Sequence, residues 1–382
     1  VYPTCSPSRA ALLTGKYASR FGIEKPIAMR SKKVLPENAE TLPEALKKDG
    51  YQTAITGKWH LGLSLESGPS HYGFDYSYGF LHGQIDQYTH RYKNGDRSWY
   101  RNDKFVDEKG HATDLITNEA IKYIKTIRDK SKPFFIYIPY SVPHYPLQEE
   151  EKWVEPYKSL NIINSRKLFD ASMTHMDYAI GEVIQTLKNE KLLDNTIIIF
   201  ISDNGGQESW YPEKESKVKL YDGKFGPYPK LGDNSPLRGY KAELYEGGIR
   251  VPAVIYWKNH LKHNKVEQLI KVTDLFPTLT AVVDSSLTQG LNLDGKNMWN
   301  YISNEKNVNE ERELYLRTPD QFALRKGDWK LIHFGNTLDK GREELYNIKN
   351  DPDETKDVIK NYPKVRNELF KELENQIKFD TQ

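Results

Sequence analysis

A single cysteine offers the most specific chemistry in this chain. Cys5 is the only cysteine among 382 residues, and it begins the run CSPSRAALLTG at residues 5–15. Pro7 is favoured in the first turn of a helix, and residues 10–13 are good helix formers. We therefore expect Cys5 at a helix N-terminus, where unpaired amides and the helix dipole favour an anion, with the positive charge of Arg9 one turn further on.

A lone cysteine is more often a small buried hydrophobe than a reactive group. The run from Cys5 onward, however, resembles the maturation signature of type I sulfatases: Cys-x-Pro-Ser-Arg, an apolar helix start and Thr-Gly. In that family the cysteine is oxidised to formylglycine. One hydroxyl of the hydrated aldehyde can attack sulfur and the other can later expel sulfate, whereas a thiol would form a thiosulfate ester with no such exit.

Three further residues resemble sulfatase site residues. Lys58 and His60 lie two apart in GKWH, so on an extended segment their side chains share one face. Alone, they would more often be a solvated lysine and a capping or core histidine. His144 lies in PHYP, where a lone histidine more often belongs to the loop architecture. The resemblance assigns Lys58 to a sulfate oxygen, His60 to the formylglycine, and His144 to protonation of the leaving alcohol.

A metal site and a further catalytic lysine are also implied. The run DNGG at 203–206 is an ideal tight turn, but its place after an apolar strand favours a metal site. Carboxylate and amide oxygens suit Ca²⁺, with Mg²⁺ possible, rather than zinc. The resemblance implies that Asp203, Asn204 and the modified Cys5 bind this cation. It also implies that Lys241, in PLRGYKAELYEGGIR, bridges the sulfate and the leaving oxygen.

In sulfatases the nucleophile follows a strand that ends in two further metal-binding aspartates. No such pair precedes Cys5 here, so we expect the chain to be truncated at its N-terminus and the signal peptide to lie in the absent part. Relatives of this kind usually work in the periplasm or outside the cell, which is the expected location. A formylglycine-generating maturation enzyme is the implied protein partner.

The elements that must position these residues alternate between strands and helices. The predicted strands are 51–56, 133–140, 195–202 and 251–257, of which 133–140 and 195–202 read as buried. The predicted helices are 41–48, 165–191 and 272–283. This alternation predicts a layered α/β fold with its site along the carboxyl edge of the sheet. The resemblance implies an alkaline-phosphatase-like architecture, a large mixed sheet sandwiched by helices.

A domain boundary is predicted in the polar segment 303–312. Residues 1–305 would form the catalytic domain and residues 306–382 a small α+β subdomain of antiparallel sheet plus helix. Within the latter we expect a hairpin at 323–332, a strand at 344–348 and a closing amphipathic helix at 363–377.

Composition limits the class of protein. The chain has 55 basic and 53 acidic residues, a formal net charge of +2, which gives no strong field for nucleic acid. No apolar run approaches the ~20 residues that a membrane span needs. One cysteine cannot form an internal disulfide.

Aromatic residues are concentrated in segments that read as loops and could stack on sugar rings: Tyr88, Tyr92, Trp99 and Tyr100 in one, and Trp210, Tyr211, Tyr221 and Tyr228 in another. The candidate substrate contacts are His82, Trp99, Trp210 and Tyr211. Long loops on a rigid scaffold often carry specificity, but tyrosine-rich loops that pack on themselves are about as frequent an explanation.

The sequence therefore predicts a sulfuric ester hydrolase that removes sulfate from a sulfated carbohydrate. Its segments most resemble the N-acetylgalactosamine-4-sulfatase (arylsulfatase B) type and bacterial polysaccharide sulfatases, so a glycosaminoglycan or algal oligosaccharide is the expected substrate. Two alternatives stay open: a phosphomonoester or phosphonate hydrolase of the same superfamily, and a non-catalytic binder of sulfated glycans.

Overall fold

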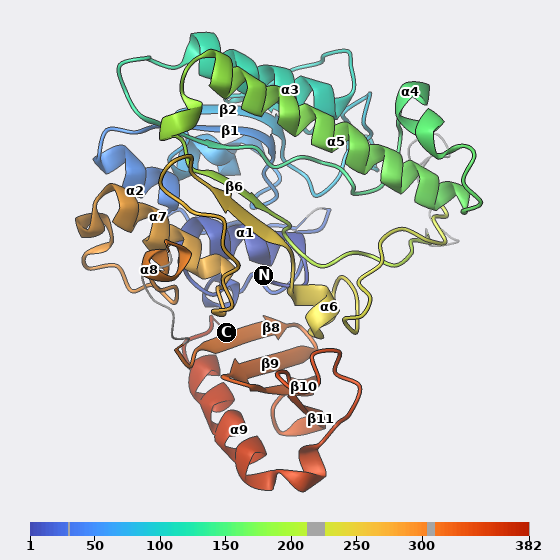
Figure 1. The fold of residues 1–382 in the computed structure, drawn as a ribbon, viewed down its shortest axis with the longest axis vertical. Coiled ribbons are helices and arrows are strands. Elements are labelled where there is room, and N and C mark those ends of the chain that lie inside the picture. Colours follow the sequence, from blue (N-terminus) through green and yellow to red (C-terminus); the bar gives the residue numbers. More distant parts are fainter. Residues whose placement is uncertain (30, 212–225, 304–309, 382) are drawn as a thin grey trace. The chain divides into compact units, whose positions relative to one another are not determined.

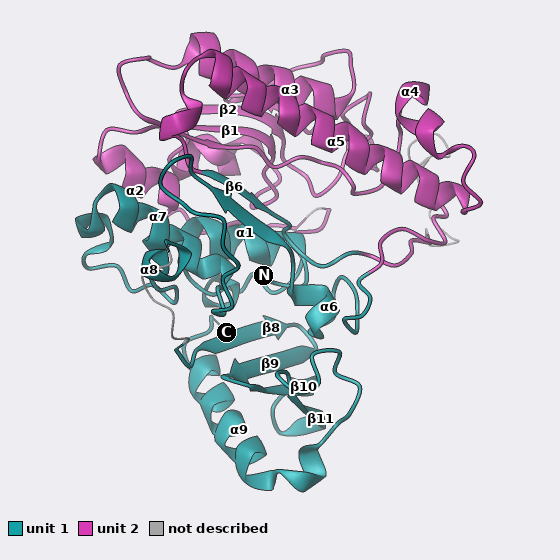
Figure 2. Ribbon diagram, viewed as in Figure 1, with its two compact units in different colours: residues 1–26, 198–206, 234–382 teal, residues 27–197, 207–233 magenta. Residues whose placement is uncertain are grey.

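The computed structural model describes residues 1–29, 31–211, 226–303 and 310–381, which form two compact units (Figures 1 and 2). Unit 1 consists of Val1–Pro26, Ile198–Gly206 and Asn234–Gln382, and unit 2 of Ile27–Ile197 and Gln207–Asp233. Each unit therefore combines segments that are far apart in the sequence.

A five-stranded mixed sheet forms the centre of unit 2, in the order β4-β3-β2-β1-β5. β1 is parallel to both β2 and β5, while β3 is antiparallel to its neighbours β2 and β4. The register pairs Lys58 with Phe80, so β1 and β2 end at the same edge. The strand bounds are β1 Gln52–Lys58, β2 Tyr76–Phe80, β3 Trp99–Arg101, β4 Lys104–Phe105 and β5 Phe134–Tyr137.

The long helices α3 and α5 of unit 2 lie side by side over this sheet (Figure 1). A core of large side chains fills the space between the sheet and α3, including Tyr78, Phe80, Trp99 and Ile116. Each such side chain contributes ~1.5–3 kcal/mol on full burial. The helices of unit 2 are α2 Leu42–Lys48, α3 Ala112–Lys122, α4 Glu151–Val154 and α5 Asn164–Asn189, with a π-helical turn at Tyr123–Ile127 and 3₁₀ turns at Leu65–Ser67, Pro69–Tyr72, Glu155–Tyr157 and Leu193–Asn195.

Unit 1 contains α1 and two sheets. β6 and β7 pair antiparallel in a two-stranded sheet, and β8 to β11 form an antiparallel sheet in the order β11-β10-β9-β8. α9 packs on β9 and β10. The bounds are α1 Cys5–Thr14, β6 Ile198–Ile201, α6 Glu246–Ile249, β7 Ala253–Tyr256, α7 Leu275–Val283, α8 Trp299–Ile302, β8 Glu313–Thr318, β9 Gln321–Lys326, β10 Trp329–Thr337, β11 Lys340–Asn347 and α9 Pro363–Ile377, with 3₁₀ turns at Ala18–Phe21, Val272–Asp274, Ser285–Thr288 and Ile359–Asn361.

Several predicted elements are confirmed, and others differ. The predicted helix 363–377 is α9, and the predicted hairpin turns at Gly327 between β9 and β10. The strands predicted at 133–140 and 195–202 are shorter, and they are half-buried rather than buried; Phe200 is 43% exposed. The physical reason is that β5 is an edge strand and β6 belongs to a sheet of only two strands.

Two further expectations concern the chain's organisation. The predicted boundary between residues 1–305 and residues 306–382 falls at 304–309, which lie outside the described residues, and it stays a prediction. None of the helices in the described part of the chain is long and apolar enough to cross a membrane.

Candidate active site

Cys5 is the first residue of α1, as the sequence predicted. The preceding residue, Thr4, has extended backbone and makes no side-chain capping hydrogen bond, so it leaves the first amides of the helix to another acceptor. The hydroxyl of Ser8 accepts a hydrogen bond from the amide of Tyr2 at 2.9 Å and fixes the approach to the helix. Cys5 is buried, with 3% of its surface exposed. A helix N-terminus of this kind favours an anion through the helix dipole.

Arg9 joins α1 to the end of β6. Its Nη2 donates to Oδ2 of Asp203 at 3.0 Å, across 194 residues of sequence. The Arg9 side chain is 6% exposed and the Asp203 side chain 30% exposed, so the pair is partly shielded from water. A guanidinium has five N–H donors, and Arg9 can therefore bind Asp203 and a second anion together.

The turn after β6 fits a hard cation. Asn204 donates its side-chain NH₂ to the carbonyl of Gly205 at 2.9 Å, which leaves its Oδ1 as an acceptor. That oxygen is buried and has no hydrogen-bond partner among the described residues. A buried orphan acceptor beside the carboxylate of Asp203 is the donor set that Ca²⁺ and Mg²⁺ prefer. Asp203 and Asn204 thus fit the cation that the resemblance implied.

Lys241 belongs to a segment that contacts both the turn after β6 and the residues just before α1. Its amide donates to the carbonyl of Gly206 at 3.0 Å, and the next amide, of Ala242, donates to the carbonyl of Pro3 at 2.9 Å. Ala242 has a φ of 77°, a strained conformation for a residue with a Cβ. Unit 1 therefore gathers Cys5, Arg9, Asp203, Asn204 and Lys241 on three connected segments.

Lys58 and His60 lie in unit 2, at the end of β1. Gly57 has a φ of 136°, and a Cβ there would lie 2.1 Å from the carbonyl oxygen of Pro139; only glycine allows this approach. The amide of Lys58 donates to that same oxygen at 2.8 Å. His60 has a φ of 59°, so the extended backbone ends at Lys58 and does not continue through His60. That the two side chains share one face stays a prediction. The Nε2 of His60 lies 3.0 Å from the carbonyl of Ile27.

His144 lies in a cluster of aromatic residues in unit 2. Its Nδ1 is 2.8 Å from the carbonyl of Tyr145, so this nitrogen carries a hydrogen. The ring of Tyr145 stacks on that of Trp210 at 4.3 Å. Trp210 pairs with Tyr228 through two backbone hydrogen bonds, and Tyr211 is 62% exposed. Tyr221, predicted in the same loop, lies outside the described residues.

His82 and Trp99, two of the candidate substrate contacts, are buried. The Nδ1 of His82 contacts the hydroxyl of Ser98 at 2.9 Å and its ring stacks on Tyr92. Burial lowers the pKa of His82 to about 4, against the opposing charge of Asp96. Trp99 and the adjacent Tyr100 form part of β3, so the expectation of a loop there is wrong. Both rings are 2% exposed or less, and Trp99 packs into the core cluster that includes Ile116 of α3.

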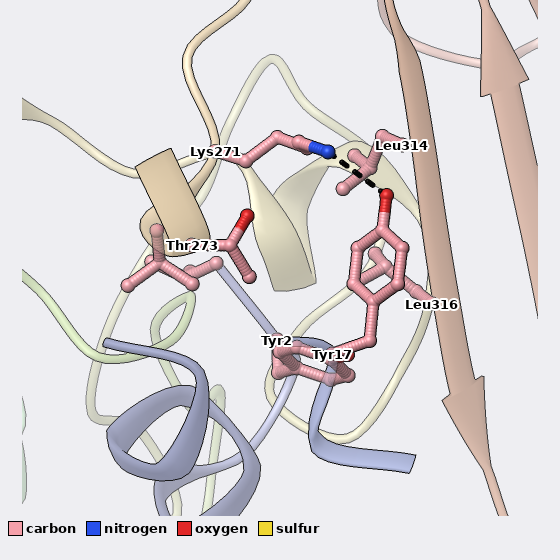
Figure 3. Close-up of a pocket in the computed structure, with 8 residues that line it drawn as sticks. Tyr2, Tyr17, Lys271, Thr273, Leu314 and Leu316 are labelled. Carbon is pink, nitrogen blue, oxygen red and sulfur yellow. Dashed lines mark hydrogen bonds between the residues drawn. The ribbon is translucent and has the colours of Figure 1, made fainter. Parts of the chain in front are cut away.

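A small cavity in unit 1 lies apart from the predicted residues (Figure 3). Its volume of about 10 Å³ holds no more than a water molecule. Lys271 donates from Nζ to the hydroxyl of Tyr17 at 3.0 Å, and burial lowers its pKa to about 8. The predicted site residues do not line this cavity, which is too small for a substrate. Its lining is Val1, Tyr2, Tyr17, Lys271, Val272, Thr273, Leu314 and Leu316.

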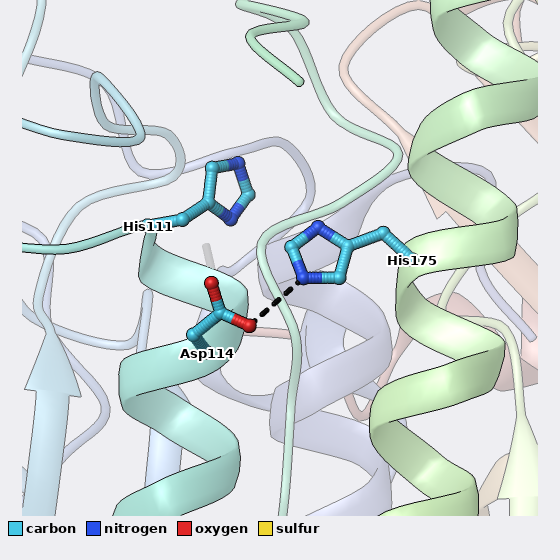
Figure 4. Close-up of side chains that lie close together, drawn as sticks. All are labelled: His111, Asp114 and His175. Atoms are coloured by element: carbon cyan, nitrogen blue, oxygen red, sulfur yellow. Dashed lines mark hydrogen bonds and ion pairs between the residues drawn. The ribbon is translucent and has the colours of Figure 1, made fainter. Parts of the chain in front are cut away.

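The structure also brings together three residues that sequence reasoning missed: His111, Asp114 and His175 (Figure 4). The spacing of His111 and Asp114 at a helix start was the available signal. His175 lies 61 residues beyond Asp114, on another helix, and only the fold places it nearby.

Comparison with known proteins shows which family this chain is similar to. The sulfatase family model matches residues 2–285, and the model for the C-terminal part of N-sulphoglucosamine sulphohydrolase matches residues 240–379. Arylsulfatase J of Mus musculus is 30% identical over 437 residues, covering 98% of this chain and 68% of that protein. N-acetylgalactosamine-6-sulfatase of Mus musculus is 30% identical over 296 residues, covering 72% of this chain and 52% of that protein. The chain spans only part of the length of both relatives.

A solved structure shares the whole described fold. The crystal structure of Ps i-CgsB in complex with k-i-k-neocarrahexaose matches with a TM-score of 0.86 and 28% identity, covering 100% of this chain and 84% of that chain. The predicted architecture, a mixed α/β fold with a C-terminal antiparallel sheet and helix, is confirmed.

Proposed function

The chain belongs to the sulfatase family, and we propose that it hydrolyses a sulfate ester of a carbohydrate through a formylglycine made from Cys5. One observation carries this proposal. In unit 1, the Arg9–Asp203 ion pair at 3.0 Å joins the helix that begins at Cys5 to the turn that contains Asn204. A nucleophile, a fixed cation and a set of oxygen ligands thus belong to one connected cluster, which is what sulfate ester hydrolysis requires.

The position of Cys5 supports its role as the nucleophile. The formylglycine, once formed, would supply a hydrated aldehyde whose hydroxyl attacks sulfur. The helix N-terminus at Cys5 directs amides toward the sulfate, and the guanidinium of Arg9 lies one turn along the same helix. Both features stabilise the negative charge that sulfate carries throughout the reaction.

The second part of the proposal concerns a cation. Asp203, Asn204 and the modified Cys5 would hold Ca²⁺, or Mg²⁺, and the bound cation would supply charge neutralisation at the sulfate oxygens. The orphan Oδ1 of Asn204 supports this assignment. Lys241, whose amide is bonded to the same turn at Gly206, adds a positive charge for the leaving oxygen.

Proton transfer is assigned to two histidines of unit 2 on the basis of the family resemblance. His144 would protonate the leaving alcohol from Nε2, because its Nδ1 is held by the carbonyl of Tyr145. His60 would take a proton from position 5 so that sulfate is released. Lys58, the last residue of β1, would bind a sulfate oxygen.

A sulfated oligosaccharide is the proposed substrate. The supporting observations are the neocarrahexaose bound to the similar structure and the name N-acetylgalactosamine-6-sulfatase among the relatives. Tyr211, exposed beside Trp210, is the proposed stacking surface for a sugar ring. We also propose that the protein is matured by a formylglycine-generating enzyme and acts in the periplasm or outside the cell.

Sulfate release from a panel of substrates tests the proposal. The panel contains neocarrageenan oligosaccharides, galactosamine oligosaccharides sulfated at position 4 or 6, and a phosphate monoester. We expect sulfate release from one glycan class and none from the Cys5→Ala variant. Faster release of phosphate than of sulfate would replace this proposal with a phosphohydrolase. Glycan binding by protein with unmodified Cys5 and no turnover would replace it with a binding protein.

A further inference from the structure

We propose that His111, Asp114 and His175 form a binding site for one Zn²⁺ in unit 2, made of residues other than those of the Asp203–Asn204 site. One ligand atom from each of the three residues lies within 4.8 Å of the others. Zinc holds nitrogen and oxygen ligands at about 2.0–2.2 Å, which places tetrahedral ligand atoms about 3.4 Å apart. Side-chain shifts that close the widest gap by up to about 1.4 Å would therefore complete the site. Figure 4 shows both imidazoles turned toward the carboxylate of Asp114.

The hydrogen bonds identify which nitrogens face the site. His111 directs Nε2 to the carbonyl of Gln148 at 2.9 Å, and His175 directs Nδ1 to Oε2 of Glu149 at 2.8 Å. The remaining nitrogens, Nδ1 of His111 and Nε2 of His175, are the ones available to a metal. Nε2 of His175 already lies 3.0 Å from Oδ1 of Asp114, a separation found between neighbouring ligands as well as in hydrogen bonds.

The outward contacts match the way proteins support metal-binding histidines. A histidine ligand usually donates its other ring N–H to a carboxylate or a backbone carbonyl, which fixes the tautomer and the ring orientation. Here the adjacent residues Gln148 and Glu149 provide one of each. The ring of Trp153 also stacks on His175 at 4.5 Å and restricts its rotation. The orientations of the two rings are therefore fixed before any ion arrives.

Burial and charge favour a cation at this point. The side chains of His111 and Glu149 are 0% exposed and that of His175 is 1% exposed, whereas Asp114 is 42% exposed and gives access to solvent. Oε1 of Glu149 is buried and lacks a hydrogen-bond partner in the described ranges. Two carboxylates beside two imidazoles carry excess negative charge, which one divalent cation neutralises when the histidines are neutral.

The donor set selects the class of metal. Two imidazole nitrogens and one carboxylate are typical of zinc, whereas Ca²⁺ prefers oxygen ligands only. On binding, the ion takes the lone pair of His175 Nε2, and any proton on that nitrogen leaves to solvent. The ion also takes the lone pair of His111 Nδ1, which otherwise accepts a 3.2 Å hydrogen bond from the amide of Thr113. Three protein ligands leave a position for water.

Zinc at this site would cross-link the start of α3 to α5 in unit 2. His111 caps α3, Asp114 lies in its first turn, and His175 lies on α5, while Glu149 follows the loop of His144. Bound zinc is therefore expected to make this loop more ordered and to raise the stability of the protein, whether or not substrate is turned over.

Metal analysis of the purified protein tests the site. After removal of metal by a chelator, the protein is titrated with Zn²⁺ and bound zinc is measured by mass spectrometry, with Ca²⁺ present in excess. We expect one zinc per chain, and visible absorption bands when Co²⁺ replaces it. Asp114→Asn and His111→Gln should lose the zinc, and Glu149→Gln should weaken its affinity about 10–100-fold.

His90→Gln is the matched control, because His90 is also buried in unit 2 and contacts a backbone carbonyl, that of Gly110 at 3.0 Å. This variant should keep one zinc per chain. Circular dichroism establishes that each variant is folded. No binding by the wild-type protein, or equal binding by wild type, Asp114→Asn and His111→Gln, would overturn the proposal and leave these residues as a hydrogen-bonded link between α3 and α5.

Discussion

Arg9 connects the helix that begins at Cys5, the proposed nucleophile, to Asp203, a proposed cation ligand, within unit 1. Replacing it in Arg9→Gln removes a buried guanidinium from the proposed sulfate site and leaves Asp203 without its 3.0 Å partner. Loss of one preorganised charge of this kind lowers kcat/KM by about 10²–10³-fold. Sulfate release by the variant measures the effect.

The control for this prediction is Arg250→Gln. Arg250 belongs to the same unit, but its side chain is 56% exposed and its contact with Glu246 is a long 3.9 Å. Its replacement should leave kcat/KM within a factor of about two, since exposed ion pairs contribute little. Equal losses in the two variants would contradict a specific role for Arg9.

His82 makes stability depend on pH. Burial lowers its folded pKa from 6.5 to about 4, so the unfolded chain binds the proton more readily between these values. The stability contribution of neutral His82 is therefore complete above pH 6.5 and is lost as pH falls toward 4. The shift corresponds to a loss on the order of 3 kcal/mol.

Urea unfolding at a series of pH values compares wild type with His82→Gln, which keeps a hydrogen-bonding group for Ser98. The stability of the wild type relative to the variant should decline between pH 6.5 and 4. His71→Gln, which alters an exposed histidine of the same unit, should follow the wild-type curve. A constant difference between wild type and His82→Gln across this range would show that His82 does not titrate with a lowered pKa.

Residues whose role depends on neighbours in sequence were predictable, and residues whose role depends on the fold were not. The helix start at Cys5 follows from Pro7 and the apolar run, and it is confirmed. Trp99 was placed in a loop because the sequence does not show that it belongs to β3 and packs in the core. His82 was proposed as a substrate contact because the sequence does not show that its ring is buried. His175 could not be paired with His111 without the packing of α3 on α5.

At the scale of elements, Gly57 allows β1 to pass close to the backbone of Pro139 just before the strand ends at Lys58. A Cβ at Gly57 would lie 2.1 Å from the carbonyl oxygen of Pro139, which is backbone and cannot move aside cheaply. Gly57→Ala should therefore destabilise the protein by more than about 4 kcal/mol or prevent folding. Thermal unfolding and soluble yield measure the effect.

Gly50→Ala is the control that measures the cost of a positive φ without a steric clash. Gly50 also has a positive φ, 79°, but a Cβ there meets no atom within 4 Å. The cost should be about 1 kcal/mol, from the left-handed conformation alone. If Gly57→Ala unfolded at the same temperature as Gly50→Ala, the close approach of β1 to Pro139 would be wrong.

Strand predictions were wrong where burial was inferred from apolar composition. The apolar run at 133–140 reads as a central strand, but only Phe134–Tyr137 forms β5, and it lies at the sheet edge. Strand order depends on contacts between distant segments, and apolar content alone does not report it. Helix α9 was predicted correctly because its amphipathic period and Pro363 at its start are local signals.

For the molecule as a whole, a buried ion cluster holds the C-terminal sheet to the segment of Lys241. Lys330 on β10 contacts Glu246 of α6 at 2.9 Å and Glu354 at 2.8 Å, and these three side chains are 2% exposed or less. Lys330→Met removes the ammonium that both buried carboxylates contact and leaves Glu246 with longer ion pairs only, to Arg325 at 3.5 Å and to Arg250 at 3.9 Å. The free energy of unfolding should fall by about 3–5 kcal/mol.

Lys326→Met is the matched control on the neighbouring strand β9. Its ion pair with Glu372 is 3.5 Å long, and the two side chains are 41% and 39% exposed. Loss of this exposed pair should change the free energy of unfolding by at most about 1 kcal/mol. Urea titration compares the two variants. Similar stability of Lys330→Met and Lys326→Met would contradict a role for the buried cluster in joining α6 to the sheet.

The central claim is that position 5 becomes a formylglycine that hydrolyses sulfate esters. The decisive measurement follows sulfate release by the protein produced together with a maturation enzyme, while mass spectrometry of the N-terminal peptide reports how much Cys5 is converted. Sulfate release should rise in proportion to conversion and be absent in Cys5→Ala. Fully converted protein that releases no sulfate from any sulfated glycan, or release that continues in Cys5→Ala, would contradict the claim.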